Sequence, residues 1–138
     1  MSDYPINVRF PMHWGEMDAL GHANNTRYFA WFETARIALF EEVGIIADQP
    51  SSVGPILATT TCDFLRPISY PADLVASARV SKVGRTSFVM EYAIRRAEDP
   101  DKVCAKGSGV VVLIDYATGE KRPVPDDLRD TIDRLHAP

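Results

Sequence analysis

The sequence lacks the features that mark several broad classes of protein. Its 138 residues contain only two cysteines, and 15 lysines and arginines are outnumbered by 19 aspartates and glutamates. The basic residues form no run, so the net charge of −4 gives no electrostatic footprint for nucleic acid. No apolar stretch approaches the roughly 20 residues that span a bilayer, and the first residues do not resemble a secretion signal. We therefore expect a cytoplasmic protein that binds neither nucleic acid nor a membrane.

The sequence also lacks the motifs of several catalytic classes. It contains no Gly-x-Ser-x-Gly nucleophile motif and no glycine-rich phosphate loop. Cys62 and Cys104 lie in apolar segments without Cys-x-x-Cys spacing or a nearby basic partner, which argues against a cysteine nucleophile. Two buried free thiols are favoured over a disulfide, although the sequence permits either.

Residues of the types that bind metals occur together near the N-terminus. His13, Glu16, Asp18 and His22 are all potential ligands, but their spacing matches no common zinc pattern. We therefore expect neither a metal nor a redox cofactor.

Length and composition indicate one globular domain over residues 1–138. Apolar residues make up 46% of the chain and charged residues 25%, a balance that supports a buried core.

The spacing of apolar residues predicts one long helix between residues 24 and 44. Asn24 is a suitable N-cap, and Gly44 is a suitable C-terminal stop. Phe29 and Phe40 widen the apolar face, which favours packing against a broad surface such as a sheet. The residues that recur at helical spacing are Tyr28, Trp31, Phe32, Ala35, Leu39 and Val43.

Alternation of apolar and polar residues predicts strands in most of the remaining chain. Residues 6–14 form the first, and Pro11 favours an edge position for it. In the strand at 73–83 the alternation places Ser77 on the polar face. The expected strands after the helix are 56–65, 73–83, 85–96 and 102–115, preceded by a Pro/Ser linker at 47–55 and followed by a short helix within 123–135.

This order of elements predicts an α+β fold in which a curved antiparallel sheet packs on one long helix. Consecutive strands joined by short turns pair antiparallel. A single layer of this kind leaves a strand edge and a sheet face with little cover, so we expect a homo-oligomer.

The stretch WGEMDALGHANNTRYF, residues 14–29, places acidic and amide side chains directly before the helix. A helix N-terminus offers unpaired N–H donors and the positive end of its dipole, which stabilise an oxyanion. The Asp18 carboxylate beside such a pocket can act as base or nucleophile, and Gly21 allows a sharp turn between the two.

These residues resemble the hotdog-fold acyl-CoA thioesterases of the 4-hydroxybenzoyl-CoA thioesterase type, over nearly the whole chain. The most specific match is Glu16-Met17-Asp18-Ala19-Leu20-Gly21-His22-Ala23-Asn24-Asn25, continued by Tyr28 and Glu33-Thr34-Ala35-Arg36. FLRPISYPADL at 64–74 and VGRTSF at 83–88 add support. Most relatives carry aspartate where this chain has Glu16, and one branch has histidine where it has Asn25.

The resemblance implies hydrolysis of an acyl-CoA thioester to free CoA and a carboxylic acid. Asp18 is then the nucleophile or general base, and the backbone N–H of Asn25 polarises the thioester carbonyl. The resemblance also implies a homodimer, in some relatives assembled into a homotetramer, with sites at the dimer interface.

Several residues of the stretch have alternative roles that the sequence leaves open. Asp18 could be an exposed loop carboxylate that caps a turn. Glu16 shares a proton network with Asp18 or is simply solvated. His22 contacts the thioester or orients a neighbouring asparagine, or it bonds a backbone carbonyl, while Trp14 lines the acyl pocket or packs in the core.

A CoA substrate carries phosphates, so cationic side chains are expected at the mouth of the site. Arg66, Lys82 and Arg85 are candidates, with Arg85 best placed in the turn after Gly84, although each could be a solvated turn charge. Thr60, within the run 59–61, could position a water molecule, and β-propensity explains threonine there equally well.

Two other classes of function compete with the thioesterase. A hotdog hydratase or dehydratase would use a histidine with a carboxylate on an enoyl or hydroxyacyl thioester. A non-catalytic acyl-CoA binding module would be expected to lack the acid at position 18, which is present as Asp18.

Overall fold

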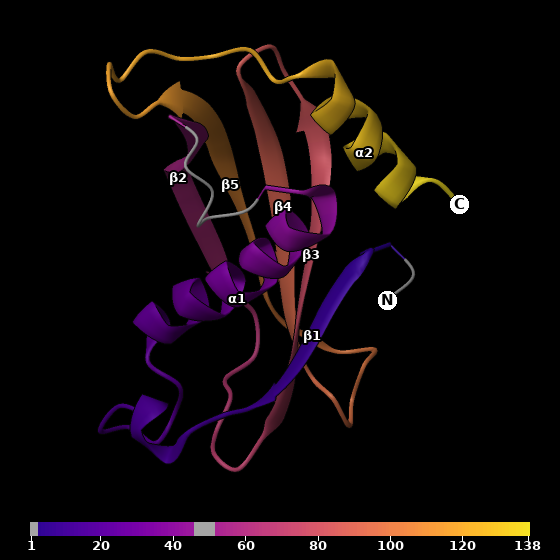
Figure 1. Cartoon of the computed structure of the whole chain (residues 1–138). Helices are drawn as coiled ribbons and strands as arrows, with labels where there is room; N and C mark the ends of the chain where they lie inside the picture. The colour runs from indigo at the N-terminus through magenta and orange to yellow at the C-terminus, as the bar shows by residue number, and fades with distance from the viewer. Residues whose placement is uncertain (1–2, 46–51) are drawn as a thin grey trace.

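The computed structural model describes residues 3–45 and 52–138, in which a curved five-stranded sheet packs against one long helix (Figure 1). The elements are, in chain order, β1 (Ile6–Pro11), the 3-10 helix η1 (Trp14–Glu16), α1 (Asn25–Val43), β2 (Val53–Phe64), β3 (Asp73–Val83), β4 (Ser87–Arg96), β5 (Val103–Asp115) and α2 (Asp126–His136). This is the α+β hotdog architecture that the sequence predicts.

All neighbouring strands of the sheet are antiparallel, in the order β1-β3-β4-β5-β2. The proline-bearing β1 is an edge strand, as expected, and β2 forms the other edge. The predicted extension of the first strand to residue 14 is wrong, because the strand ends at Pro11 and residues 14–16 form η1. Proline has no N–H for the ladder, which fits a strand end at this position.

Helix α1 begins and ends at the residues that its capping signals predict. The side-chain oxygen of Asn24 accepts the N–H of Thr26 at 3.0 Å, and Gly44 adopts a left-handed φ of 89°. Phe32, at the middle of the buried face, stacks on Tyr92 of β4 with ring centroids 4.8 Å apart. All six residues of the predicted apolar stripe are buried, namely Tyr28, Trp31, Phe32, Ala35, Leu39 and Val43.

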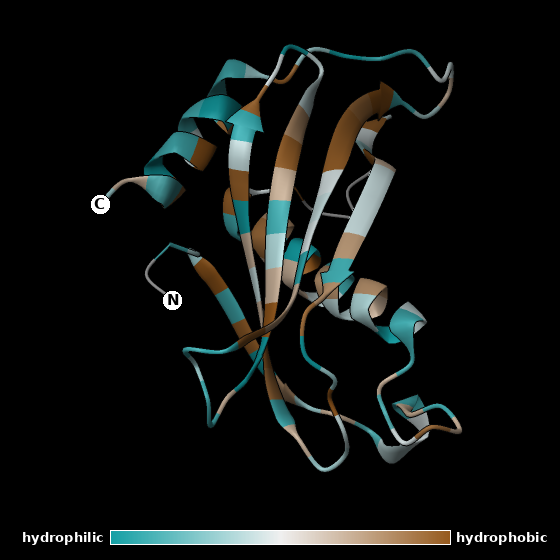
Figure 2. Cartoon of the chain, turned by 180° about the vertical axis from the view of Figure 1, so that it is seen from behind, coloured by the Kyte–Doolittle hydropathy of each residue, from teal (hydrophilic) through white to brown (hydrophobic). Residues whose placement is uncertain are grey.

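The sheet face opposite α1, which we call the outer face, carries hydrophilic as well as hydrophobic residues (Figure 2), and some of the hydrophilic ones are buried. Ser77 lies on the polar face of the strand, as the alternation predicts, but it is fully buried and donates a 2.6 Å hydrogen bond to the side chain of Asn7. Arg95 is also buried, with its guanidinium 5.5 Å from the ring centre of Tyr4. The N-terminal residues therefore cover part of the outer face.

The remaining expectations concern the chain ends, the linker and the cysteines. The predicted C-terminal helix is present as α2 and buries Ile132. Most of the predicted linker lies outside the described residues, and β2 begins at Val53 rather than at residue 56. Cys62 and Cys104 are free, as favoured, although Cys62 is only half-buried. Among the described residues, no helix is both long and apolar enough to cross a membrane.

Candidate active site

A short loop returns the chain from η1 to the start of α1, and we call residues 17–23 the site loop. Its two ends are joined by a bridge between Met17 and Ala23. Inside the loop, the N–H of Asp18 donates to the carbonyl of His22 at 2.9 Å, and the N–H of Gly21 donates to the carbonyl of Asp18 at 3.1 Å. Gly21 has φ of 81°, a conformation that glycine adopts without strain. The sharp turn expected there is therefore present.

Asp18 caps the turn of the site loop and also presents its carboxylate to solvent. Its Oδ1 accepts the N–H of Leu20 at 2.9 Å, which fixes the side chain. Within the described part of the chain, Oδ2 has no hydrogen-bond partner. The two readings of Asp18 are thus compatible, because a carboxylate held by one oxygen keeps the other for a ligand.

The N-terminus of α1 carries a free donor beside this loop. Asn25 is the first residue of the helix, and its N–H has no acceptor among the described residues. The next N–H, of Thr26, is already bonded to Asn24. An N–H in the first turn has no intrahelical partner, so this donor is available to a bound group.

Asp18 and Asn25 line the same surface hollow, whose volume is about 370 Å³. It lies between the site loop, the first turn of α1 and the segment that follows β2. Its mixture of one acid, one cation and several apolar side chains suits a ligand with both polar and apolar parts. The lining residues are Asp18, His22, Ala23, Asn25, Tyr28, Phe64, Leu65, Arg66 and Pro67.

Two titratable side chains close to the hollow are held protonated at neutral pH. Burial, with smaller contributions from Cys104 and Cys62, raises the pKa of Tyr28 to about 12. Burial, assisted by Asp63, raises the pKa of the Cys62 thiol to about 11. Near pH 7, therefore, Tyr28 supplies no phenolate base and Cys62 no thiolate nucleophile.

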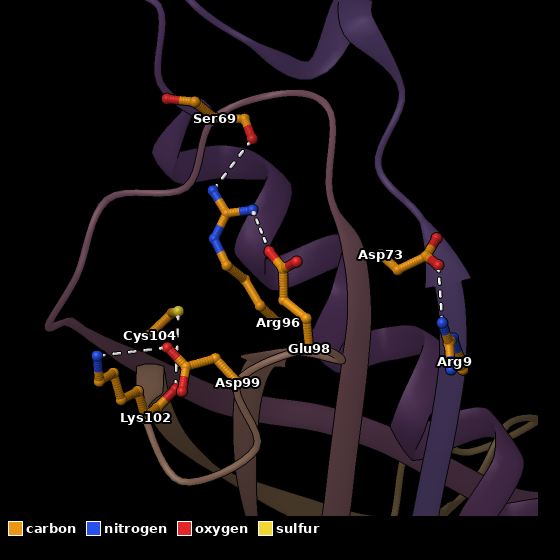
Figure 3. Close-up of polar contacts among 8 residues, drawn as sticks. All are labelled: Arg9, Ser69, Asp73, Arg96, Glu98, Asp99, Lys102 and Cys104. Carbon is orange, nitrogen blue, oxygen red and sulfur yellow. Dashed lines mark hydrogen bonds and ion pairs between the residues drawn. The ribbon is translucent and has the colours of Figure 1, made fainter.

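The segment 65–72 fastens the site loop to the end of the sheet. The N–H of Ala23 donates to the carbonyl of Ile68 at 2.7 Å, and the hydroxyl of Ser69 donates to the carbonyl of Gly21 at 2.8 Å. Arg96, the last residue of β4, donates to the carbonyl of Ser69 at 3.2 Å (Figure 3). Hydrogen bonds thus link the end of the sheet to this segment, and this segment to the site loop.

The first residues of β5 support the same segment. The N–H groups of Leu65 and Arg66 both donate to the carbonyl of Cys104, at 2.9 and 3.0 Å. Figure 3 shows Cys104 next to the ion pair between Lys102 and Asp99, whose atoms are 3.5 Å apart. These bonds fix the backbone of Arg66, whose side chain lines the hollow.

The structure brings some of the predicted substrate-binding residues to the hollow and places others elsewhere. Arg66 lines it. Thr60 pairs with Gly109 in the middle of the β2–β5 ladder, and Lys82 and Arg85 lie near the β3–β4 turn, at the opposite end of the sheet. Trp14 is 70% exposed in η1, so it does not pack in the core of the protomer.

The structure bears on the alternative roles that the sequence leaves open for His22 and Glu16. The ring of His22 is exposed on the hollow and bonds no carbonyl within the described part of the chain. The carboxylate of Glu16 is neither free nor bonded to Asp18, since it accepts the indole N–H of Trp31 at 3.0 Å. Trp31 lies 15 positions away in the chain, so local sequence patterns carry no signal of this contact.

The described residues contain no group of three or more His, Cys, Asp or Glu side chains that could hold a metal ion.

Comparison with known proteins supports the fold and identifies the family. The sequence model of the thioesterase-like superfamily matches residues 12–132. The solved structure of the PA2801 protein of Pseudomonas aeruginosa has a TM-score of 0.86 at 33% identity, covering 94% of this chain and 98% of its own. A thioesterase of Thermus thermophilus, solved with coenzyme A and Zn, has a TM-score of 0.85 at 30% identity and covers 100% of this chain and 99% of its own.

A curated relative covers the same extent of the chain. YsmA of Bacillus subtilis (strain 168) is 27% identical over 127 residues, which are 92% of this chain and 82% of that protein. The family match takes in the site loop, all of α1 and the sheet from β2 to β5. The chain belongs to the thioesterase-like superfamily of thioester hydrolases.

Proposed function

We propose that the protein hydrolyses acyl-CoA thioesters to free CoA and a carboxylic acid. The observation that carries this proposal is the hollow in which the Asp18 carboxylate and the unpaired N–H of Asn25 lie together. A thioester carbonyl placed there has an anionic group for the attack and a donor for the oxygen that becomes negative.

The attack on the carbonyl carbon has two routes that use the same groups. In the first, Asp18 takes a proton from water as the water oxygen bonds to the carbon. In the second, Asp18 itself bonds to the carbon, and water then cleaves the resulting anhydride. In both, the Asn25 N–H stabilises the oxyanion and the carbon–sulfur bond breaks. In the first route the proton held by Asp18 passes to the leaving sulfur, whereas in the second CoA leaves as a thiolate and takes up a proton released when water cleaves the anhydride.

The polar part of the substrate fits the cationic side chain at the hollow. Arg66 supplies a guanidinium that suits a phosphate of CoA. The Thermus thermophilus thioesterase, which covers this whole chain, was solved with coenzyme A, and this supports CoA as the carrier here. Tyr28, Phe64 and Leu65 offer apolar surface for the acyl group.

The site is incomplete in one protomer, and we propose that a second copy completes it. Asp18, His22 and Asn25 are all exposed, whereas thioester hydrolysis benefits from a site that excludes water. Strand β2 forms an edge of the sheet, to which the β2 of a second copy could pair antiparallel about a two-fold axis.

Such a dimer would bring together residues that are far apart in one protomer. Antiparallel pairing reverses the partner's strands, so the β3–β4 end of the partner's sheet would lie on the side of the site loop. Lys82 and Arg85 would then serve the site of the opposite protomer. A homotetramer would be a pair of such dimers.

The test is release of free thiol from a panel of aliphatic and aromatic acyl-CoAs by the purified protein, with no metal or cofactor added. Thiol release above the uncatalysed rate, from at least one member, is the expected result. Hydration of an enoyl-CoA without thiol release would instead indicate a hydratase. Tight binding of acyl-CoA with no turnover would indicate a binding module, and either result would overturn the proposal.

A further inference from the structure

Glu16 uses both oxygens of its carboxylate to join two segments of the chain. Oε2 accepts the indole N–H of Trp31 on α1 at 3.0 Å. Oε1 accepts the backbone N–H of His13, ahead of η1, at 2.7 Å. The side chain is half-buried and stands two residues before Asp18. Glu16 therefore holds the chain directly before the site loop against helix α1.

Trp31 is a rigid anchor for this contact. It is 3% exposed and packs edge-on against Tyr28, with ring centroids 4.9 Å apart, and against Phe10 at 6.1 Å. A buried indole N–H needs an acceptor, and a carboxylate is a strong one. Trp31 lies six residues beyond Asn25 on the same helix, a rise of about 9 Å. The anchor thus belongs to the rigid element that presents the Asn25 donor.

The backbone of Glu16 closes the same unit from the other side. Its carbonyl accepts the N–H of Asn24 at 2.9 Å, directly before the helix begins. The site loop, Met17 to Ala23, therefore begins and ends at residues that are hydrogen-bonded to each other, Glu16 and Asn24. A shift of Glu16 would move Asp18 relative to the N-terminus of α1, and a misplacement of about 1 Å can lower a rate about 10²-fold.

We propose that Glu16 is a positioning residue of the hydrolysis, acting through Trp31 to set Asp18 against the donor of Asn25. The proposal rests on the function proposed above. Glu16 touches neither the substrate nor the reacting atoms, and it exchanges no proton. It serves as a double acceptor, for which glutamine is an incomplete replacement because only one of its two terminal atoms accepts.

The test compares kcat, KM and pH profiles of thiol release for the wild type, Glu16→Gln, Glu16→Ala and Trp31→Phe. We expect kcat to fall about 10- to 100-fold in Glu16→Ala with KM changed less than about threefold, and less severely in Glu16→Gln. The pH dependence of kcat should keep the wild-type midpoints, because a positioning residue transfers no proton to or from the substrate. Glu42→Gln, on the exposed face of α1, is the matched control and should behave as wild type.

A double-mutant comparison with Trp31 shows whether Glu16→Ala lowers kcat through the bond to Trp31 or through a general loss of structure. In a Trp31→Phe background, Glu16→Ala should cost less in kcat than it does in the wild type, because the bond is already absent. In a Trp14→Phe background Trp31 is the sole tryptophan of the chain, and its emission should shift when Glu16 is replaced. Melting curves establish that each variant is folded.

The outcomes distinguish this proposal from the proposed function. Wild-type protein that releases no thiol would overturn both. An Asp18→Asn variant with the wild-type rate would leave the hydrolysis standing but would overturn the role of Asp18 and, with it, the positioning role of Glu16. An inactive Asp18→Asn with a fully active Glu16→Ala would overturn the positioning role alone. An undiminished effect of Glu16→Ala in the Trp31→Phe background would also overturn it, since Glu16 would then act by another route.

Discussion

Phe32 of α1 lies directly on Gly107 of β5, where a larger residue would carry its Cβ. A Cβ built on Gly107 would stand 2.6 Å from Cζ of Phe32 and 2.6 Å from the carbonyl oxygen of Thr61. The carbonyl belongs to the neighbouring strand and cannot move without breaking the ladder. The helix can approach the sheet this closely only because the strand has no side chain at this point.

Gly107→Ala should therefore destabilise the protein by about 1–3 kcal/mol through overpacking. Gly15→Ala is the matched control, because a Cβ there meets nothing within 4 Å. Urea unfolding followed by circular dichroism measures both. Equal free energies of unfolding for the two variants would show that the contact between α1 and β5 is looser than described.

Tyr28 predicts a loss of stability at alkaline pH. Its pKa rises from an ordinary value of 10.0 to about 12 on folding, because burial disfavours the phenolate. The folded state then retains a proton that the unfolded state has lost, so the contribution is complete below pH 10 and disappears as the pH rises from 10 to 12. The full effect is at most about 2–3 kcal/mol.

Tyr28→Phe removes this titration and should flatten the fall in stability above pH 10 relative to the wild type. The measurement is the free energy of unfolding from pH 8 to 12 for both proteins. Cys62 contributes a similar loss that begins lower, since its pKa rises from 9.0 to about 11, and it is common to both proteins. Parallel curves for the two proteins would contradict the assigned shift of Tyr28.

Subunit complementation tests whether Arg85 serves the site of the opposite protomer. Arg85→Ala and Asp18→Asn should each have low activity alone at limiting substrate. In a mixed dimer, one site would combine an intact Asp18 with an intact Arg85 from the partner subunit. Random mixing should then restore roughly a quarter of the wild-type activity.

Co-purification of the two variants under different affinity tags isolates the mixed dimer, in which one of the two sites is intact, so its activity should approach half that of the wild type. Arg129→Ala is a useful comparison, because Arg129 donates to the carbonyl of Gly84 at 3.0 Å and so tests the shape of the same turn without removing its outward charge. Activity of the mixture no higher than the sum of its parts would mean that Arg85 does not act across the interface.

The sequence predicts α1 and the strands well because their signals are local. The apolar stripe of α1, its Asn24 cap and its Gly44 stop all lie within the element they define, and the structure retains each of them. The alternation in β3 and β4 likewise predicts which residues face the helix. The burial of Ser77 could not be predicted from the alternation, because it involves Asn7, 70 positions away.

The candidate site likewise combines local features, which the sequence indicates, with contacts between distant segments, which it does not. The proposed acid Asp18, the turn at Gly21 and the proposed donor at Asn25 belong to one continuous stretch, so a local pattern of residues can indicate them. The support of that stretch comes from distant segments, namely the carbonyl of Ile68, the hydroxyl of Ser69 and the indole of Trp31. Those contacts arise only when the sheet and helix pack, so no spacing in the sequence indicates them.

The role of Asp18 in the hydrolysis is tested most directly by kcat of thiol release for Asp18→Asn. Asparagine keeps the oxygen that accepts the N–H of Leu20, so the loop and the melting temperature should be preserved. We predict a fall in kcat of about 10²- to 10⁴-fold, the range for loss of a general base, with Asp101→Asn in the β4–β5 turn unchanged. A folded Asp18→Asn protein with the wild-type kcat would contradict this role.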